Sequence, residues 1–328
     1  MADLKVGTVV QWQKLSPILV VFRLLPERGT PFPDYKPGQY FALRREKCRL
    51  TKKVVGADGR ARYVADLDAN GQPKLGPVTH SYSIVSAPFE TREQGYLEFY
   101  VVLEVYESGE HGRLSGSMFT MNPPVDDTLT YVNRIVGDFT LDHRANGLKS
   151  VVFVGTGTGL APFVSMIRQL DFDASKGKTD GVRYTLLHAN RIYDELAFHR
   201  ELLAIEAARR FDFQYLPSVS RPTTRDLEDA GMGRGRANNL LRHIFDMPLK
   251  EERELTEVLA RGEDPSRARA ALQKTTAPAL PTHLSRTELQ HRLNPARTVI
   301  LTCGNVSLME DIKYIADAHR IRFEKEDW

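Results

Sequence analysis

The stretch from Val151 to Leu170 limits the possible folds of this chain more than any other part of the sequence. It opens with an apolar, mostly β-branched segment at residues 151–154, which is typical of a buried parallel strand. A glycine-rich turn follows, made of Gly155, Thr156, Gly157, Thr158 and Gly159. Pro162 then stands where the first turn of a helix would begin. A strand, a glycine turn and a helix in this order can bind a phosphate group, because glycines let the backbone approach the anion and the helix N-terminus offers free N–H groups.

The spacing of these glycines differs from the common dinucleotide-binding fingerprint, G-x-G-x-x-G. The third glycine comes one residue early, and Leu160 occupies its usual place. Taken alone, the turn is compatible both with nucleotide binding and with a glycine-rich connection that binds nothing. Other parts of the chain have to decide between the two interpretations.

Composition narrows the class of protein. The chain has 328 residues, enough for two domains, with 41% hydrophobic and 27% charged residues. Its two cysteines, Cys48 and Cys303, are too few for a disulfide framework or for the four thiolates of an iron–sulfur cluster, and we predict no metal site. No apolar run approaches the roughly 18 residues of a membrane helix, and the first residues lack the apolar core of a signal peptide, so we expect a cytoplasmic location and no membrane contact. The net charge of +3 is compatible with an acidic protein partner and too small to indicate nucleic acid.

The first part of the chain has the pattern of a small β-barrel. Apolar segments separated by turn signals occur at residues 6–12, 18–25, 39–43, 96–104 and 128–136. Repeated short strands of this kind predict an antiparallel, six-stranded β-barrel over residues 1–147.

Residues 44–78 are an excursion from that barrel. Turn signals on both sides of a short strand at 62–65 predict one or two solvent-facing hairpins. The excursion begins with a basic cluster, made of Arg44, Arg45, Lys47, Arg49, Lys52 and Lys53. This cluster is either a solvated charged surface or a docking surface for an acidic partner.

Strands and helices alternate over residues 148–328, which predicts a doubly wound parallel sheet. Further strands are expected at 182–189, 211–219 and 298–302, and further helices at 194–209, 238–245 and 308–319. A charged segment at 249–296, with three prolines and two short helical patches, interrupts the pattern. It is long for a connection and is either a functional loop or a partly ordered insertion.

The residues that follow the second and third strands of this sheet indicate which nucleotide would fit. The second strand ends without the acidic residue that usually binds the ribose hydroxyls of NAD. Ser220 and Arg221 follow the third strand, and Arg234 and Arg236 come shortly after. Hydroxyl and guanidinium groups suit the 2′-phosphate of NADP, although each arginine alone could be an ordinary surface residue.

With these residues in place, the chain resembles the ferredoxin/flavodoxin–NADP⁺ reductase family, most closely its bacterial branch. The resemblance covers the chain outside the two excursions. In that family a barrel domain binds FAD through an Arg-x-Tyr-Ser motif, and the matching stretch here is His80, Ser81, Tyr82 and Ser83. The resemblance implies that Tyr82 stacks on the isoalloxazine ring and that Ser83 hydrogen-bonds near flavin N5. It also implies backbone contacts to the flavin from the strand around Tyr100 and Val102.

Further motifs carry the same resemblance. Gly112, Arg113, Leu114 and Ser115 are similar to the family's second phosphate-binding turn, and the residues from Gly155 to Pro162 are similar to its NADP pyrophosphate loop. Ser220 and Arg221 resemble the 2′-phosphate clamp. Cys303 and Gly304 resemble the Cys-Gly pair beside the nicotinamide. The terminal Trp328 is similar to the aromatic lid over the other flavin face, which would move aside for the nicotinamide.

The chain departs from the family at His80, where the family has arginine. A neutral imidazole carries no charge, so we expect weaker binding of the flavin phosphate at high pH, unless Arg113 takes the role of the missing cation.

The resemblance implies an FAD-dependent reductase that moves electrons between NADP(H) and a one-electron carrier, ferredoxin or flavodoxin. Hydride would pass between nicotinamide C4 and flavin N5, with Ser83, Cys303 and Trp328 at the reacting centre. The expected partner is an acidic electron carrier, and the chain is expected to be a monomer. Two alternatives stay open: the reductase component of an oxygenase system, and a non-catalytic nucleotide-binding module, which the substitution at His80 would favour.

Overall fold

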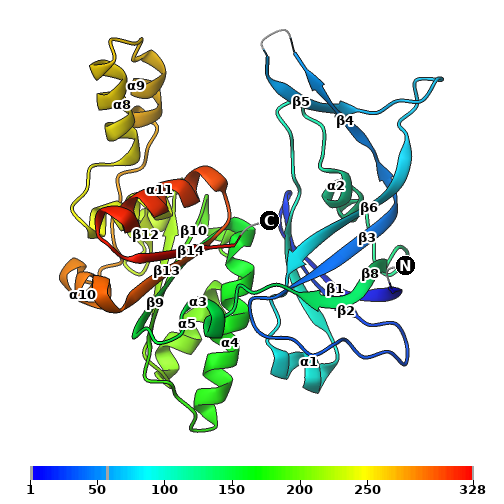
Figure 1. Ribbon diagram of the computed structural model, residues 1–328, viewed down its shortest axis with the longest axis horizontal. Helices are drawn as coiled ribbons and strands as arrows, with labels where there is room; N and C mark the ends of the chain where they lie inside the picture. Colours follow the sequence, from blue (N-terminus) through cyan, green and yellow to red (C-terminus); the bar gives the residue numbers. More distant parts are fainter. Residues whose placement is uncertain (1–2, 57–58, 327–328) are drawn as a thin grey trace. The chain divides into compact units, whose positions relative to one another are not determined.

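A computed structural model describes residues 3–56 and 59–326 of the chain. These residues form two compact units (Figure 1). The first unit contains residues 3–140 and 164–169, and the second contains residues 141–163 and 170–326.

Six antiparallel strands form a curled sheet in the first unit, in the order β6-β3-β8-β1-β2-β7 (Figure 1). Their bounds are β1 Leu4–Ser16, β2 Leu19–Leu25, β3 Tyr40–Arg49, β6 Leu75–Ser83, β7 Leu97–Val102 and β8 Thr128–Val136. The two edges meet just after β6, where the N–H of Val85 donates to the carbonyl of Glu98 at 2.8 Å. The predicted six-stranded antiparallel fold is therefore confirmed, as a half-barrel. Two short helices complete the unit, α1 Pro88–Gln94 and α2 Arg113–Phe119.

Aromatic side chains dominate the core inside this sheet. Phe22, Phe41 and Phe99 are fully buried, and the ring centroids of Phe22 and Phe99 lie 5.3 Å apart. Trp12 stacks on Phe22 at 5.5 Å and meets Phe119 of α2 edge-on at 6.3 Å. Large rings bury much apolar area at a small cost in side-chain entropy, so this core holds the curled sheet around α2.

The excursion in the first unit is a hairpin of two strands, β4 Thr51–Val55 and β5 Ala61–Ala65. Tyr63 fixes it to the loop that follows β7. The Tyr63 ring stacks on Tyr106 at 4.9 Å, and the hydroxyl of Ser108 donates to the Tyr63 carbonyl at 2.7 Å. The hairpin is thus tied to the segment that leads into α2.

The second unit contains a six-stranded parallel sheet in the order β12-β11-β10-β9-β13-β14. The strands are β9 Ser150–Thr156, β10 Arg183–Asn190, β11 Phe213–Val219, β12 Gly233–Arg234, β13 Thr298–Cys303 and β14 Arg322–Lys325. The helices are α3 Leu141–Arg144, α4 Ala161–Ser175, α5 His199–Ala208, α6 Thr224–Glu228, α7 Ala237–Ile244, α8 Lys250–Ala260, α9 Ser266–Gln273, α10 Arg286–Arg292 and α11 Val306–Ala318, and α4 contributes residues 164–169 to the first unit. All residues of β11 and β13 are buried, as expected for central strands covered by helices on both faces. The predicted doubly wound parallel sheet is confirmed.

The helix expected over residues 194–209 is wrong in its first part. A short 3-10 turn at Tyr193–Glu195 comes first, Phe198 has a φ of +60°, and α5 begins only at His199. Glu195 is buried, where it accepts from the Arg191 Nε at 2.9 Å. The Asn190 amide donates to the Glu195 carbonyl at 2.7 Å. These local hydrogen bonds hold the segment as a turn at the end of β10.

The excursion at 249–296 holds three helices, α8, α9 and α10, where the sequence suggested two patches. Figure 1 shows α8 and α9 as an adjacent pair beyond the end of the sheet. Just before α8, the Pro248 carbonyl accepts from Arg242 Nη1 at 2.9 Å. Arg242 of α7 is itself held in a buried ion pair, with Nη2 2.6 Å from Asp311 Oδ1 of α11. Arg253 of α8 lies 3.6 Å from the same carboxylate oxygen. The excursion is therefore a folded insertion that shares charged contacts with the core of the second unit.

Across the two described stretches of chain, no helix combines the length and the apolar character that a membrane span requires.

Candidate functional site

The glycine turn after β9 has the local structure that its sequence predicts. Residues Gly157–Leu160 form a 3-10 turn, and α4 follows with Pro162 in its first turn. Gly157 has a φ of +53°, and a Cβ built there would meet no atom within 4 Å. The backbone at Gly157 is therefore open to an approaching group, which is the space that a phosphate needs.

The other side of the same turn lies against the end of β13. A Cβ on Gly159 would stand 2.1 Å from the carbonyl oxygen of Cys303, so no larger residue fits. Gly304 has a φ of +136°, and a Cβ there would stand 2.6 Å from the Thr156 hydroxyl. The structure thus brings the predicted phosphate loop and the predicted Cys-Gly pair together at the carboxyl edge of the sheet.

Cys303 has an acidic neighbour that the sequence analysis missed. Its thiol is fully buried and donates to Glu326 Oε2 at 3.4 Å. Glu326 follows β14 directly and is 4% exposed. Its position after the last strand of the sheet is the one signal that could have pointed to it, because carboxyl ends of parallel strands share one edge.

The predicted 2′-phosphate residues gather at the same edge, at the ends of β10, β11 and β12. The N–H groups of Ser220 and Arg221 donate to the carbonyls of Asn190 and Arg191, at 2.9 and 2.8 Å. Arg234 ends β12, which pairs with β11. Arg236 stands at the N-cap position of α7 and makes no side-chain hydrogen bond to the helix N-terminus. Four of the residues expected to contact the nucleotide, Ser220, Arg221, Arg234 and Arg236, thus follow neighbouring strands.

Arg236 is paired in a way that the sequence did not predict. Its Nη1 donates to Glu251 Oε1 at 3.0 Å. Glu251 belongs to α8 of the insertion and is buried, whereas the Arg236 side chain is 59% exposed. Among the described residues, neither Arg221 nor Arg234 takes part in an ion pair, so Arg236 differs from both.

The predicted flavin motif lies along the end of β6. His80 and Ser81 are exposed, Tyr82 is half-buried and Ser83 is buried. Burial and the negative charge of Glu104 raise the pKa of Tyr82 well above its usual value, which leaves a neutral phenol ring. Ser83 pairs with Tyr40 in the ladder between β6 and β3.

The other predicted flavin contacts come from β7, whose Tyr100 is buried and whose Val102 is 37% exposed. Trp328 lies outside the described residues.

The turn before α2 carries the charges of this second site. A Cβ on Gly112 would stand 2.5 Å from Glu104 Oε2 and 2.6 Å from the Ser115 hydroxyl, so the turn is closely packed there. Arg113 and Glu104 are near enough to His80 to act on its titration. Partial burial, followed by the positive charge of Arg113, lowers the pKa of His80, while Glu104 opposes the shift. At neutral pH the site therefore offers one cation, one carboxylate and an uncharged imidazole. Glu104 was not among the predicted residues.

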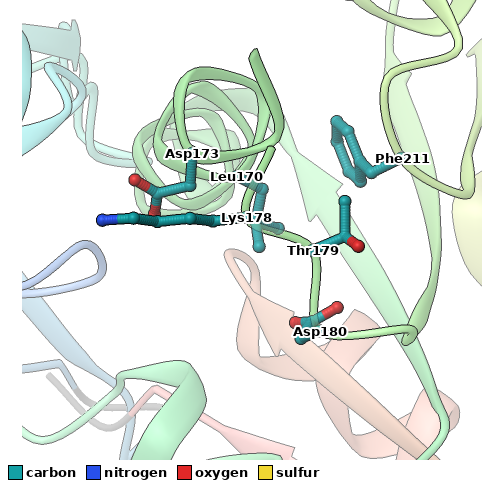
Figure 2. A pocket seen from close by; sticks show the side chains of 6 residues that line it. All are labelled: Leu170, Asp173, Lys178, Thr179, Asp180 and Phe211. Carbon is teal, nitrogen blue, oxygen red and sulfur yellow. The ribbon is translucent and has the colours of Figure 1, made fainter. Parts of the chain in front are cut away.

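A cavity of about 270 Å³ in the second unit lies away from these residues (Figure 2). It is lined by Leu170, Asp173, Lys178, Thr179, Asp180 and Phe211. These residues belong to the C-terminal part of α4 or precede β10 and β11, so the cavity opens at the amino edge of the sheet. It contains none of the predicted site residues.

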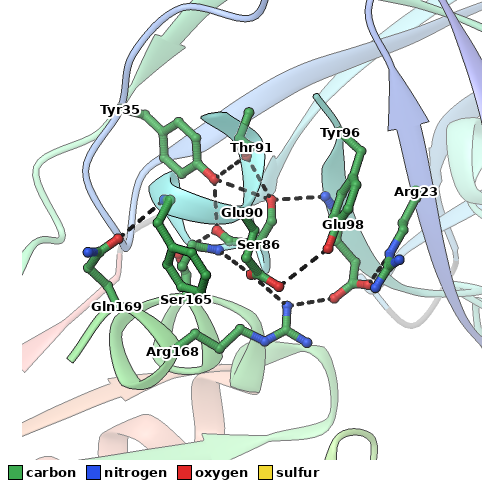
Figure 3. Close-up of polar contacts among 12 residues, drawn as sticks. Arg23, Tyr35, Ser86, Glu90, Thr91, Tyr96, Glu98, Ser165, Arg168 and Gln169 are labelled. Carbon is green, nitrogen blue, oxygen red and sulfur yellow. Dashed lines mark hydrogen bonds and ion pairs between the residues drawn. The ribbon is translucent and has the colours of Figure 1, made fainter. Parts of the chain in front are cut away.

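A buried charged cluster in the first unit is also separate from the predicted site (Figure 3). Arg168 Nη1 lies 2.8 Å from Glu98 Oε2 and 3.2 Å from Glu90 Oε2, and Arg23 Nε lies 2.8 Å from Glu98 Oε1. The two guanidinium groups balance the two carboxylates, which is the condition for burying charge in an apolar interior. Its role is structural: it fastens residues 164–169 of α4 within the first unit. Within the described residues, no group of three or more His, Cys, Asp or Glu side chains is placed to hold a metal ion.

Comparisons with known proteins agree with this arrangement. Residues 153–259 match the family model described as the oxidoreductase NAD-binding domain. NADH-cytochrome b5 reductase 2 of Scheffersomyces stipitis is 26% identical over 138 residues, 42% of this chain and 41% of the relative. The flavohemoprotein of Bordetella pertussis is 29% identical over 201 residues, 61% of this chain and 40% of the relative. The chain spans about two fifths of the length of these curated relatives.

Among solved structures, a ferredoxin NADP⁺ reductase from Neisseria gonorrhoeae, crystallised with FAD and NADP, aligns with a TM-score of 0.58. The two chains are 18% identical, and the alignment covers 99% of each. The family-model match and the fold together define the class of protein. It has an antiparallel half-barrel followed by a unit that matches the oxidoreductase NAD-binding domain. Within that class, the fold is like that of the ferredoxin NADP⁺ reductase from Neisseria gonorrhoeae, so the resemblance predicted from the sequence is confirmed at the level of the fold.

Proposed function

We propose that this chain is an FAD-dependent reductase that moves electrons between NADP(H) and a one-electron carrier protein. The observation that carries the proposal is the packing of Gly159 against Cys303, because it unites a phosphate-binding turn and a buried thiol at one sheet edge. Bound FAD would supply the exchange between a two-electron hydride and single electrons. The first unit would bind FAD and the second unit would bind the nucleotide.

The residues of the second unit have distinct roles in this proposal. The backbone of residues 155–160 would cradle the pyrophosphate, with Gly157 on its open side. Ser220, Arg221, Arg234 and Arg236 would bind the 2′-phosphate. Cys303 and Gly304 would shape the nicotinamide pocket, and the bond from the Cys303 thiol to Glu326 would fix the orientation of the thiol.

The residues of the first unit would bind the flavin. Tyr82 would stack on the ring system and Ser83 would donate a hydrogen bond near flavin N5. The backbone of β7 around Tyr100 and Val102 would also contact the flavin. The turn Gly112, Arg113, Leu114 and Ser115 would bind the flavin phosphates together with His80 and Ser81. Trp328 keeps its predicted role as the lid.

An anaerobic titration tests the proposal. Purified chain is incubated with FAD, freed of excess flavin, and titrated with NADPH and with NADH while the flavin absorbance is recorded. We expect bleaching at a much lower concentration of NADPH than of NADH. Arg221→Gln should weaken the NADPH response by about tenfold and leave NADH unchanged. Arg134→Gln, at an exposed arginine of the first unit, is the matched control for the loss of one positive charge.

The outcomes separate the candidate functions. A chain that takes up no flavin would contradict the reductase and favour a nucleotide-binding module, for which the histidine at position 80, with its lowered pKa, is the supporting observation. Equal responses to both nucleotides would retain the reductase and remove the NADP preference.

The partner is the least constrained part of the proposal. Ferredoxin or flavodoxin is the expected carrier, and the relatives named for cytochrome b5 reductase and flavohemoprotein make a haem protein, or an oxygenase component, the alternative. Mixing the reduced chain with each carrier and following the carrier's own absorbance distinguishes them.

A further inference from the structure

The helical insertion contacts the proposed 2′-phosphate residues at three places, two of them in the segment after α9. The Thr276 hydroxyl, after α9, donates to the Ser220 carbonyl at 2.7 Å. Arg234 and Ala279 exchange a pair of backbone hydrogen bonds, at 2.8 and 3.0 Å. The returning segment of the insertion therefore forms part of the edge at which the nucleotide phosphate would bind.

The third contact is the ion pair between Arg236 and Glu251 at the start of α8. Asn239 donates to Glu251 Oε2 at 2.8 Å, and Arg236 donates to Oε1 at 3.0 Å, so both carboxylate oxygens are occupied. The backbone N–H of Lys250 donates to the side-chain oxygen Oδ1 of Asn239 at 3.0 Å. This bond fastens the first turn of α8 to α7.

The position of Glu251 is also held from further along α8. Arg253 lies over the Tyr314 ring at 4.1 Å and within 3.6 Å of the buried Asp311 carboxylate. These contacts with α11 fix the helix on the sheet unit. Glu251 is thus a built-in acidic partner for one of the three arginines of the edge, at a fixed place.

We propose that Glu251 is a specificity-determining residue, which neutralises Arg236 and thereby lowers the preference of this edge for a nucleotide with a 2′-phosphate. The inference rests on the proposed function, because it assumes that the nucleotide phosphate binds at Ser220 and the neighbouring arginines. When a carboxylate and a phosphate contact the same guanidinium, their negative charges repel each other. A ribose without the phosphate carries no charge, so the carboxylate does not repel it. The insertion would therefore weaken, without removing, the preference of the site for the nucleotide with a 2′-phosphate.

Calorimetry with two small probes tests this inference on the full chain without flavin. The probes are adenosine 2′,5′-bisphosphate and 5′-AMP, which differ only in the 2′-phosphate. Glu251→Gln should tighten binding of the bisphosphate by roughly three- to tenfold and leave 5′-AMP unchanged. The gain should shrink at high salt, because it comes from charge at a partly exposed site. Glu263→Gln is the matched control, since Glu263 is on the same insertion in an exposed pair with Arg261.

Two further variants keep the test decisive if Glu251→Gln alone unfolds, which circular dichroism would show. Arg236→Gln leaves the pair with one negative charge and should weaken bisphosphate binding by roughly three- to tenfold. The double variant Arg236→Gln with Glu251→Gln restores a neutral pair and should return to within about twofold of the wild type.

The outcomes are distinct. A double variant as weak as Arg236→Gln would overturn the inference, because Glu251 would then be a bystander. The inference would also be overturned if Glu251→Gln changed the affinity for both probes equally, or changed neither affinity. In either case the proposed nucleotide site would be retained. A wild-type chain that binds neither probe would remove the nucleotide site itself, and this inference with it.

Discussion

The two glycine turns to which we assign phosphate groups are built on different physical principles. In the second unit, Gly159 is required by backbone packing against Cys303, and the open side at Gly157 offers uncharged N–H groups. In the first unit, the turn at Gly112 packs against side-chain atoms of Glu104 and Ser115, and charged groups surround it. The comparison teaches that a site of backbone N–H groups does not titrate, whereas a site that includes His80 responds to pH, and salt weakens the binding of a phosphate at either one.

The largest effect is expected from Gly159→Ala. The added methyl group would meet the Cys303 carbonyl at 2.1 Å, where only backbone could move aside. We expect a loss of about 3 kcal/mol in the free energy of unfolding, measured by chemical denaturation. Gly112→Ala should cost less, about 2 kcal/mol, because the Glu104 carboxylate and the Ser115 hydroxyl can rotate away and only Glu104 Cβ, at 2.7 Å, has to shift. Gly177→Ala, at a positive φ with open space around it, is the control for backbone strain and should also cost about 1 kcal/mol. Equal losses for Gly159→Ala and Gly112→Ala would remove the contrast between the two turns.

Acid should destabilise the second unit through His188. Burial lowers the pKa of His188 to about 3, and its Nδ1 hydrogen-bonds the fully buried Tyr215 hydroxyl at 2.9 Å. The folded chain keeps this imidazole neutral, whereas the unfolded chain takes up a proton below its ordinary pKa of 6.5. The stabilisation is therefore complete above pH 6.5 and is lost by about 1.4 kcal/mol for each pH unit as the pH falls toward 3.

The pH dependence of unfolding in two variants checks this expectation. His188→Gln should flatten the slope of the unfolding free energy between pH 6.5 and 4, and His283→Gln, at an exposed histidine, should leave it unchanged. Identical slopes for His188→Gln and the wild type would show that other groups carry the acid sensitivity.

In the first unit, pH should act on binding. The lowered pKa of His80 leaves it uncharged at pH 7, so affinity for FAD should rise as the pH falls through that pKa. His80→Arg supplies a permanent charge and should bind FAD about tenfold more tightly at pH 7, with a flat pH profile. Flavin fluorescence quenching measures both. Thr79→Arg adds the same charge at the neighbouring exposed position of β6 and should change the affinity little. A similar gain from either variant would mean that only the net charge matters.

The smallest effect is expected from Glu104→Gln. Removing this carboxylate takes one repulsive charge away from the flavin phosphates, so FAD affinity should rise by about threefold at low salt and less at high salt. Glu107→Gln, on the same loop and exposed, is the control. A loss of affinity with Glu104→Gln would indicate that the hydrogen bond from the Tyr106 hydroxyl to the Glu104 carboxylate, and not the charge of the carboxylate, governs the site.

Local patterns predicted the fold well. The apolar run before Gly155, the glycine turn and Pro162 determine their own conformation through contacts within a few residues, and the structure has them as expected. The break before α5 was missed because it depends on the fold of Glu195 back onto Arg191 and Asn190, which the helical spacing of the segment conceals.

The acidic members of the candidate site could not be predicted. Each acidic residue contacts a partner on another element of the fold, as Glu104, Glu251 and Glu326 show. Between Cys303 and Glu326, for example, the chain passes through α11 and β14. The chain has 42 acidic residues, most of which have no reason from sequence alone to be singled out. Basic and glycine residues next to strand ends carry a positional signal, whereas a carboxylate partner is defined only by tertiary packing.

The stacking of Trp12 on Phe22 has a consequence for how the molecule can be observed. The chain contains two tryptophans, Trp12 and Trp328. Trp12 is held in the aromatic core of the half-barrel, so its emission reports the packing of the first unit. A Trp12→Phe variant would leave Trp328 as the single indole fluorophore. Its quenching by added flavin would then give an optical signal from the chain terminus alone, free of any contribution from the core.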